Sequence, residues 1–120
     1  MGRHEDERGV IQDLLGPVGV VTEIVTRKGA IRGNHVHFET IQWTYIVSGR
    51  MRIVTGDPSG KVTDIVYKPG DMACELQGVA HAWQALEDCT CLVFTRGPRS
   101  GEDYESDTYR LTGPDRLIVP

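Results

Sequence analysis

His35 and His37 are separated by a single residue in the segment RGNHVHFETIQ, residues 32–42. On a β-strand, alternate side chains leave from the same face, so the two imidazoles are expected to converge while Val36 turns away. Gln42 follows on the next expected strand, and His81 comes after a later glycine-bearing turn. Imidazole nitrogens suit zinc, iron, manganese, nickel and copper. This spacing predicts a metal site made of His35, His37, His81 and Gln42.

The same histidines also suit proton transfer. An unperturbed imidazole titrates at ~6.5, and a second ring close by disfavours protonation of both, so one neutral ring can act as a base. Abstraction of a proton next to a carbonyl also needs a donor for the enolate oxygen. The candidates for that donor are His81, Tyr45, Tyr67 and Arg52, and the sequence does not choose among them. Hydrogen-bonded core histidines are the structural alternative, and His4, in a charged segment, is expected to be solvated.

Short β-branched runs separated by turns must position these residues. The sequence has 14 glycines and 6 prolines, many of them between such runs. Residues 42–48 and 50–55 are predicted to form an antiparallel pair around Gly49. Alternation along the first of them predicts that Trp43 and Tyr45 face away if Gln42 faces the cavity. The expected strands are residues 18–26, 34–38, 42–48, 50–55, 62–67, 72–76, 81–86 and 90–96.

The composition limits the class of protein. At 120 residues and 39% hydrophobic content, one domain with a real core is expected. Seventeen acidic and 13 basic residues give a net charge of -4 without a basic stripe, so neither nucleic acid nor a membrane is an expected partner. The polar opening is unlike a signal peptide, and a cytoplasmic protein is expected. Cys74, Cys89 and Cys91 lack the spacing of a disulfide or zinc framework, and small buried core residues are the favoured interpretation.

Two stretches resemble the two motifs of the cupin superfamily. The first is Gly29-x5-His35-x-His37-x4-Gln42-x6-Gly49, and the second is Gly70-x5-Leu76-x-Gly78-x2-His81-x3-Ala85. The resemblance implies an all-β, single-domain, RmlC-like jelly-roll β-barrel in which His35, His37 and His81 meet.

The sequence departs from the cupin motifs at Gln42, Leu76 and Ala85, where the family usually has glutamate, proline and asparagine. Gln42 matters most, because a neutral amide oxygen is a weaker ligand than a carboxylate and cancels no charge. Glu39 lies two residues beyond His37 and is an alternative source of that charge if the strand continues. We rank it below Gln42.

A narrower resemblance concerns Arg32-Gly33-Asn34-His35-x-His37, Gln42-Trp43 and Asp6-Glu7-Arg8-Gly9-x-Ile11. These residues resemble those of sugar-nucleotide cupins, which include keto-sugar isomerases and epimerases and the cupin domain of a capsular-polysaccharide reductase. For a metal-independent isomerase, the resemblance implies that His35 is the base, His37 its neighbour or a substrate contact, and Arg32 a partner for a phosphate or sugar oxygen.

Three interpretations of function remain. The leading one is a cupin that binds a divalent transition metal and acts on a small carbonyl-bearing or sugar-derived substrate. The second is a metal-independent sugar-nucleotide isomerase or epimerase, and the third is a non-catalytic binding or sensing module. We expect a homodimer in which residues 1–17 pair with the barrel or a partner, residues 18–96 form the barrel, and residues 97–120 wrap barrel or partner through Tyr104, Tyr109 and Leu111.

Overall fold

The fold is built almost entirely from antiparallel strands, and the computed structural model describes residues 2–98 and 106–120. No helix among these residues is long and apolar enough to cross a membrane. The elements are β1 (Arg3–Asp6), β2 (Gly9–Gln12), β3 (Val20–Thr26), β4 (Ile31–Val36), β5 (Ile41–Ser48), β6 (Met51–Gly56), β7 (Val62–Tyr67), β8 (Met72–Glu75), β9 (Ala80–Ala85), β10 (Cys89–Arg96), β11 (Tyr109–Arg110) and the 3-10 helix η1 (Gly113–Asp115).

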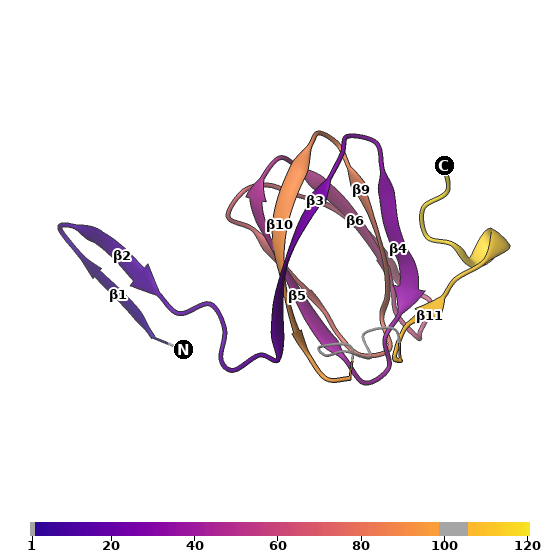
Figure 1. Cartoon of the computed structure of the whole chain (residues 1–120), viewed down its shortest axis with the longest axis horizontal. Coiled ribbons are helices and arrows are strands. Elements are labelled where there is room, and N and C mark those ends of the chain that lie inside the picture. The colour runs from indigo at the N-terminus through magenta and orange to yellow at the C-terminus, as the bar shows by residue number, and fades with distance from the viewer. Residues whose placement is uncertain (1, 99–105) are drawn as a thin grey trace.

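Two sheets face each other (Figure 1). One has the strand order β3-β10-β5-β8 and the other β11-β4-β9-β6-β7, while β1 and β2 form a separate hairpin. All strand pairs are antiparallel. This arrangement confirms the predicted all-β jelly-roll barrel.

The predicted pairing of residues 42–48 with residues 50–55 is wrong. β5 pairs with β10 and β8, whereas β6 lies in the other sheet between β7 and β9. The chain changes sheets at Gly49, whose φ is 79° and where an added Cβ would stand 2.2 Å from the carbonyl oxygen of Asp88. Only glycine permits both this left-handed conformation and this approach. The glycine therefore marks a crossover between sheets rather than a hairpin.

Alternation along β5 has the predicted phase. Gln42, Thr44 and Ile46 are buried, and Trp43 and Tyr45 lie on the opposite side of the strand. Along the inward face of β5, polar Gln42 and Thr44 are thus followed by apolar Ile46. Ile46 belongs to the main core cluster, made of Ile46, Met51, Ile53, Ala73, Trp83, Ala85, Cys89, Cys91 and Val93.

The three cysteines do not share one environment. Cys89 and Cys91 are buried as predicted, and burial, with smaller effects from nearby charges, raises the pKa of Cys91 to about 12. Cys91 is therefore a neutral thiol at neutral pH. The prediction that Cys74 is buried is wrong, because Cys74 is exposed while its neighbours Ala73 and Glu75 face inward.

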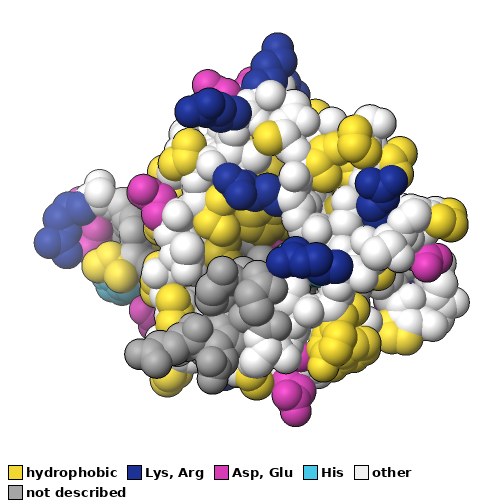
Figure 2. Space-filling view, turned by 45° about the vertical axis from the view of Figure 1, so that its right-hand side comes forward, with side chains coloured by type: hydrophobic (Ala, Val, Ile, Leu, Met, Phe, Trp, Pro, Cys, Tyr) yellow, Lys and Arg dark blue, Asp and Glu magenta, His cyan; other side chains and the backbone are white. Residues whose placement is uncertain are grey.

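The two end segments differ in how they meet the barrel. The β1–β2 hairpin projects from it, and β11 with the segment after it lies along the five-stranded sheet (Figure 1). Ile118 packs with Val54 and Ala82 on that sheet. Figure 2 shows Lys and Arg side chains spread singly over the visible face, with hydrophobic side chains between them. Residues 99–105 of the expected 97–120 extension, including Tyr104, lie outside the described residues.

Candidate functional site

A β-bulge in β4 brings the site residues to one face of the strand. Arg32 lies opposite Trp83 and His35 opposite His81, with a register shift between Gly33 and His35. In a regular strand, residues 32 and 35 would point to opposite faces, and the extra residue of the bulge removes that conflict. Asn34 has a φ of 55°, and an added Cβ at Gly33 would stand 2.9 Å from the carbonyl oxygen of His81. The Gly33-Asn34 pair therefore places Arg32 and His35 together.

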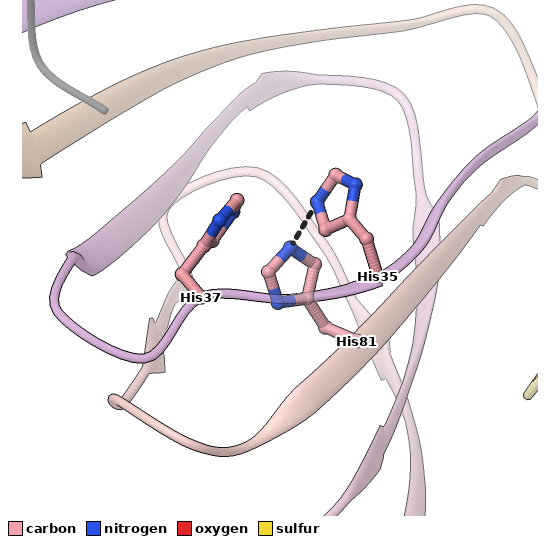
Figure 3. A group of neighbouring side chains, drawn as sticks. All are labelled: His35, His37 and His81. Carbon is pink, nitrogen blue, oxygen red and sulfur yellow. Dashed lines mark hydrogen bonds between the residues drawn. The ribbon is translucent and has the colours of Figure 1, made fainter. Parts of the chain in front are cut away.

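The three predicted histidines meet inside the barrel (Figure 3). His35 lies on β4, His37 follows its last residue, and His81 lies on β9. His37 and His81 are 2% exposed and His35 is half-buried. One ligand nitrogen from each ring lies within 4.8 Å of the others, and Nε2 of His35 is 2.9 Å from Nε2 of His81. These nitrogens are close enough to share one ion or one proton.

The segment around Asp107 fixes the ring of His37. Nδ1 of His37 donates to the backbone carbonyl oxygen of Asp107 at 2.8 Å, because a carbonyl oxygen only accepts. The Asp107 carboxylate accepts hydrogen bonds from the backbone N–H groups of Phe38 and Glu39. In a neutral His37 ring, the lone pair therefore resides on Nε2. A metal-binding histidine commonly has this support from a backbone carbonyl.

Hydrogen bonds also set the charge of Asp107. Burial acts to raise the pKa of this carboxyl, but hydrogen bonds from the Glu39 N–H, the Thr40 side chain and the Phe38 N–H, together with His37, lower it overall. The ionised form is thus favoured in a residue that is 2% exposed. This anion anchors the turn that carries His37.

A buried carboxylate that the sequence interpretation missed lies beside Gln42. Glu75 on β8 is the register partner of Gln42 on β5, and it is 2% exposed. Its Oε2 accepts from Nε2 of Gln42 at 2.6 Å and lies 3.6 Å from Nε2 of His81. Its Oε1 accepts from Oγ1 of Thr44 at 2.8 Å. The sequence signal that could have identified Glu75 was its position next to Leu76 in the second motif. That signal does not show whether the side chain points inward, because the orientation depends on the phase of β8.

Glu39 does not supply the missing charge, so that alternative is wrong. β4 ends at Val36, and Glu39 lies exposed in the following turn, where its N–H bonds to Asp107. The strand continuation that would have aligned Glu39 with His35 and His37 does not occur. Glu75, from the opposite sheet, places a carboxylate oxygen 3.6 Å from Nε2 of His81.

Arg32 and Trp83 lie in the wall of a cavity of about 180 Å³ next to the histidines. Its lining also includes His35, Gln42 and His81. Arg32 spans the two sheets, since its Nε donates to Oγ1 of Thr26 and its Nη2 to the carbonyl oxygen of Val25. The buried indole Nε1 of Trp83 has no hydrogen-bond partner among the described residues. The cavity wall thus contains a guanidinium group and an aromatic ring.

The other candidate donors lie elsewhere. Arg52 bonds with Asp64 on the neighbouring strand β7, and Tyr67 packs against the apolar core cluster. Tyr45 is on the outward side of β5. His4 lies in the β1–β2 hairpin with its side chain 67% exposed, as its charged surroundings predicted. Of the four donors considered, only His81 adjoins the cavity.

The imidazole set fits a transition metal. Two nitrogen ligands at ~2.1 Å from one ion stand ~3.0 to ~3.4 Å apart, depending on the coordination angle. The 2.9 Å separation between His35 and His81 is near this range, and the third nitrogen lies within 4.8 Å. Metal-binding histidines commonly have a carbonyl oxygen or a carboxylate beside the ring. Here the carbonyl oxygen of Asp107 contacts His37, and the Glu75 carboxylate lies beside His81.

Comparison with known proteins gives the family. A family model described as Cupin matches residues 12–100. A search of curated proteins gave no match.

Solved structures share the fold at low sequence identity. The epimerase rmlC of Mycobacterium tuberculosis is 21% identical with a TM-score of 0.73, covering 98% of this chain and 70% of the other. The QdtA 3,4-ketoisomerase of Thermoanaerobacterium thermosaccharolyticum, solved with TDP, is 22% identical with a TM-score of 0.69. The match covers 92% of this chain and 83% of the QdtA chain. The capsular polysaccharide assembling protein CapF of Staphylococcus aureus is 18% identical with a TM-score of 0.70, covering 80% of this chain.

This chain spans only 27% of the CapF chain, so CapF as a whole is a larger protein than the matched barrel. The family match spans both histidine-bearing motifs and nearly all of the two facing sheets. The chain belongs to the cupin family.

Proposed function

We propose that this cupin binds one divalent transition metal through His35, His37 and His81 and acts on a small carbonyl-bearing or sugar-derived substrate. The observation that carries the proposal is the convergence of three imidazole nitrogens within 4.8 Å of one another. A metal bound there would supply Lewis-acid polarisation of a substrate oxygen. The metal is zinc, iron, manganese, nickel or copper, all of which accept imidazole ligands.

The chain's own residues would prepare this site in two ways. The carbonyl oxygen of Asp107 holds the His37 ring with its Nδ1–H outward, so Nε2 is the ligand atom of the neutral ring. Gln42 is the fourth candidate ligand through its amide oxygen, and it shares the cavity with His35 and His81.

The cavity supports a small, acceptor-rich substrate. Its volume of about 180 Å³ is below the ~300–1,000 Å³ of ordinary ligand pockets. It therefore suits the reacting part of a substrate rather than a whole nucleotide sugar. Arg32 is a donor that suits sugar hydroxyl, carbonyl or carboxylate oxygens.

Metal content tests the proposal. Protein purified without a histidine tag should carry about one equivalent of a transition metal, or regain it on reconstitution, as measured by elemental analysis. His81→Ala should lose the metal, whereas His4→Ala, in the exposed hairpin, should retain it. A native protein that neither carries nor binds metal would refute the proposal.

A second candidate function is metal-independent isomerisation or epimerisation of a nucleotide sugar. The 2.9 Å contact between Nε2 of His35 and Nε2 of His81 favours it, because one neutral ring must donate and the other accept. QdtA and rmlC, whose barrels resemble this one, are a ketoisomerase and an epimerase. In this function His35 is the base, His37 its neighbour, and Arg32 contacts a phosphate or sugar oxygen.

Chelation separates the two functions. Turnover of a TDP-linked keto-sugar that survives complete metal removal would support proton transfer by histidine, and His35→Gln should abolish that turnover while TDP-sugar binding is largely retained. Turnover that requires added metal would support the first proposal. Isothermal titration with TDP measures binding independently of turnover.

The expected homodimer is also a proposal. β3 is an edge strand with Val21 and Val25 about half exposed, and the projecting hairpin carries Ile11 at 71% exposure. A second chain that covers these residues would bury the edge. Light scattering at micromolar concentration should give twice the monomer mass, and Ile11→Ser should weaken that association.

A further inference from the structure

Glu75 and Gln42 form one buried pair at the boundary between the histidines and the four-stranded sheet. They face each other directly in the β5–β8 register, and both are at most 4% exposed. The short 2.6 Å bond from Nε2 of Gln42 to Oε2 of Glu75 and the 2.8 Å bond from Thr44 to Oε1 hold both carboxylate oxygens. The pair is therefore fixed rather than mobile.

The bond to Glu75 sets the orientation of the Gln42 amide. The contact joins Nε2 of Gln42 to Oε2 of Glu75, so the NH2 group is the branch of the amide that faces the carboxyl group and donates to it. The carbonyl oxygen Oε1 is then the other branch of the same amide. Because Gln42 lines the cavity together with His35 and His81, this oxygen is the branch suited to a cation.

Charge gives a second reason for the pair. Burying a carboxylate is costly unless a positive charge compensates it. Gln42 and Thr44 are neutral donors, so the positive charge that an observed contact can bring to Glu75 comes from the side of His81, as a protonated ring or as a cation bound to it. Oε2 of Glu75 lies 3.6 Å from Nε2 of His81. A divalent ion on three neutral imidazoles places uncompensated positive charge beside this carboxylate. Each charge thus lowers the cost of burying the other.

We propose that Gln42 and Glu75 together replace a single carboxylate ligand of the metal site. Gln42 contributes its amide oxygen, while Glu75 orients that amide and supplies the negative charge from the neighbouring strand. Glu75 is a positioning residue in this arrangement. The inference rests on the proposed metal function. It adds that Glu75 supplies the negative charge that is missing at residue 42, where the first motif usually has a glutamate.

Charge removal and charge transposition test the inference. Zn²⁺ affinity would be measured by competition with a chromophoric chelator, and Co²⁺ absorption would report the ligand environment. Glu75→Gln should weaken Zn²⁺ binding by roughly 10- to 100-fold, the usual range for groups that support metal ligands. The double variant Gln42→Glu/Glu75→Gln moves the carboxylate across the pair and should restore affinity. Glu39→Gln makes the same change at an exposed position and is the matched control.

The outcomes separate this inference from the proposed function. If the native protein binds no Zn²⁺ or Co²⁺, both are refuted. If it binds and Glu75→Gln matches Glu39→Gln in affinity and in the Co²⁺ spectrum, only the inference is refuted. If Glu75→Gln does not fold, the double variant decides: native-like affinity supports the inference, and a tenfold or larger loss overturns it.

Discussion

Residues 106–118 and the β1–β2 hairpin are both outside the facing sheets, yet they meet the barrel in different ways. Asp107 and Ile118 are 2% and 4% exposed, whereas Ile11 in the hairpin is 71% exposed. The later segment reaches the barrel through hydrogen bonds to backbone groups as well as apolar contact. The hairpin bonds mainly within itself. Attachment thus depends on specific anchors and not on apolar content alone.

Hydrogen bonds between the later segment and the barrel converge on β4 and the turn after it. Asp107 bonds to residues 37–39, and β11 pairs with Val36 and His35. The side chain of Asn34, within the bulge, donates to the carbonyl oxygen of Ile118 and accepts from the N–H groups of Leu117 and Ile118. The segment therefore supports the strand that carries His35 and precedes His37.

The largest expected effect comes from removing each segment in turn. Deleting residues 106–120 should destabilise the barrel by roughly 4 kcal/mol or more, because it uncovers Val54 and Ala82 and removes the partners of several buried polar groups. Deleting residues 2–13 should change the free energy of unfolding of the barrel far less. Urea denaturation followed by tryptophan fluorescence measures both, and equal losses would contradict the contrast.

Single apolar substitutions sharpen the same contrast. Ile118→Ala should cost about 2–4 kcal/mol, because it opens a gap in the cluster with Val54 and Ala82. Ile11→Ala, the matched change on the hairpin, should cost less than about 0.5 kcal/mol. Thermal and urea unfolding give both values. A large effect at Ile11 in dilute, monomeric protein would show that the hairpin contributes to barrel stability.

Asp107 tests the polar anchoring directly. Asp107→Asn should cost about 1–3 kcal/mol, because Oδ1 and Oδ2 each accept one N–H, from Phe38 and Glu39, and the amide replaces one of these oxygens with an NH2 group that cannot accept. The turn that holds His37 should loosen, so Zn²⁺ affinity should fall by ~10-fold. Nitrogen NMR of His37 in the native protein should show the proton on Nδ1, and its loss in the variant would confirm the coupling. An unchanged His37 signal would contradict it.

The smallest effect is expected at the exposed Asp6–Arg8 pair of the hairpin. Hydrogen bonds from Arg8 hold the pKa of Asp6 below its usual value of 3.8. Any stabilisation is thus complete above that value and is lost as the pH falls through the lowered pKa. Because both groups are solvated, Arg8→Ala should not shift the thermal midpoint measurably at pH 7. A clear, salt-dependent shift would show that this ion pair does stabilise the hairpin.

The sequence predicted the site better along each strand than between strands. His35 and His37 share a face because alternation is a local property of extended backbone, and the same rule put Trp43 and Tyr45 on the opposite side of the strand from Gln42. The proposed hairpin at Gly49 failed because pairing between strands depends on partners distant in the chain. The expected burial of Cys74 was wrong because it rested on residue type, which does not give the phase of β8.

The sequence by itself determined the β-rich class, the single barrel and the three histidines, since residue type and spacing act locally through turns and strand alternation. Tertiary structure alone decided that Glu75 faces Gln42, that the bulge at Asn34 turns Arg32 and His35 to one side, and that Asp107 holds His37. These contacts join residues far apart in the chain, and only the pairing of whole sheets brings them within hydrogen-bond distance.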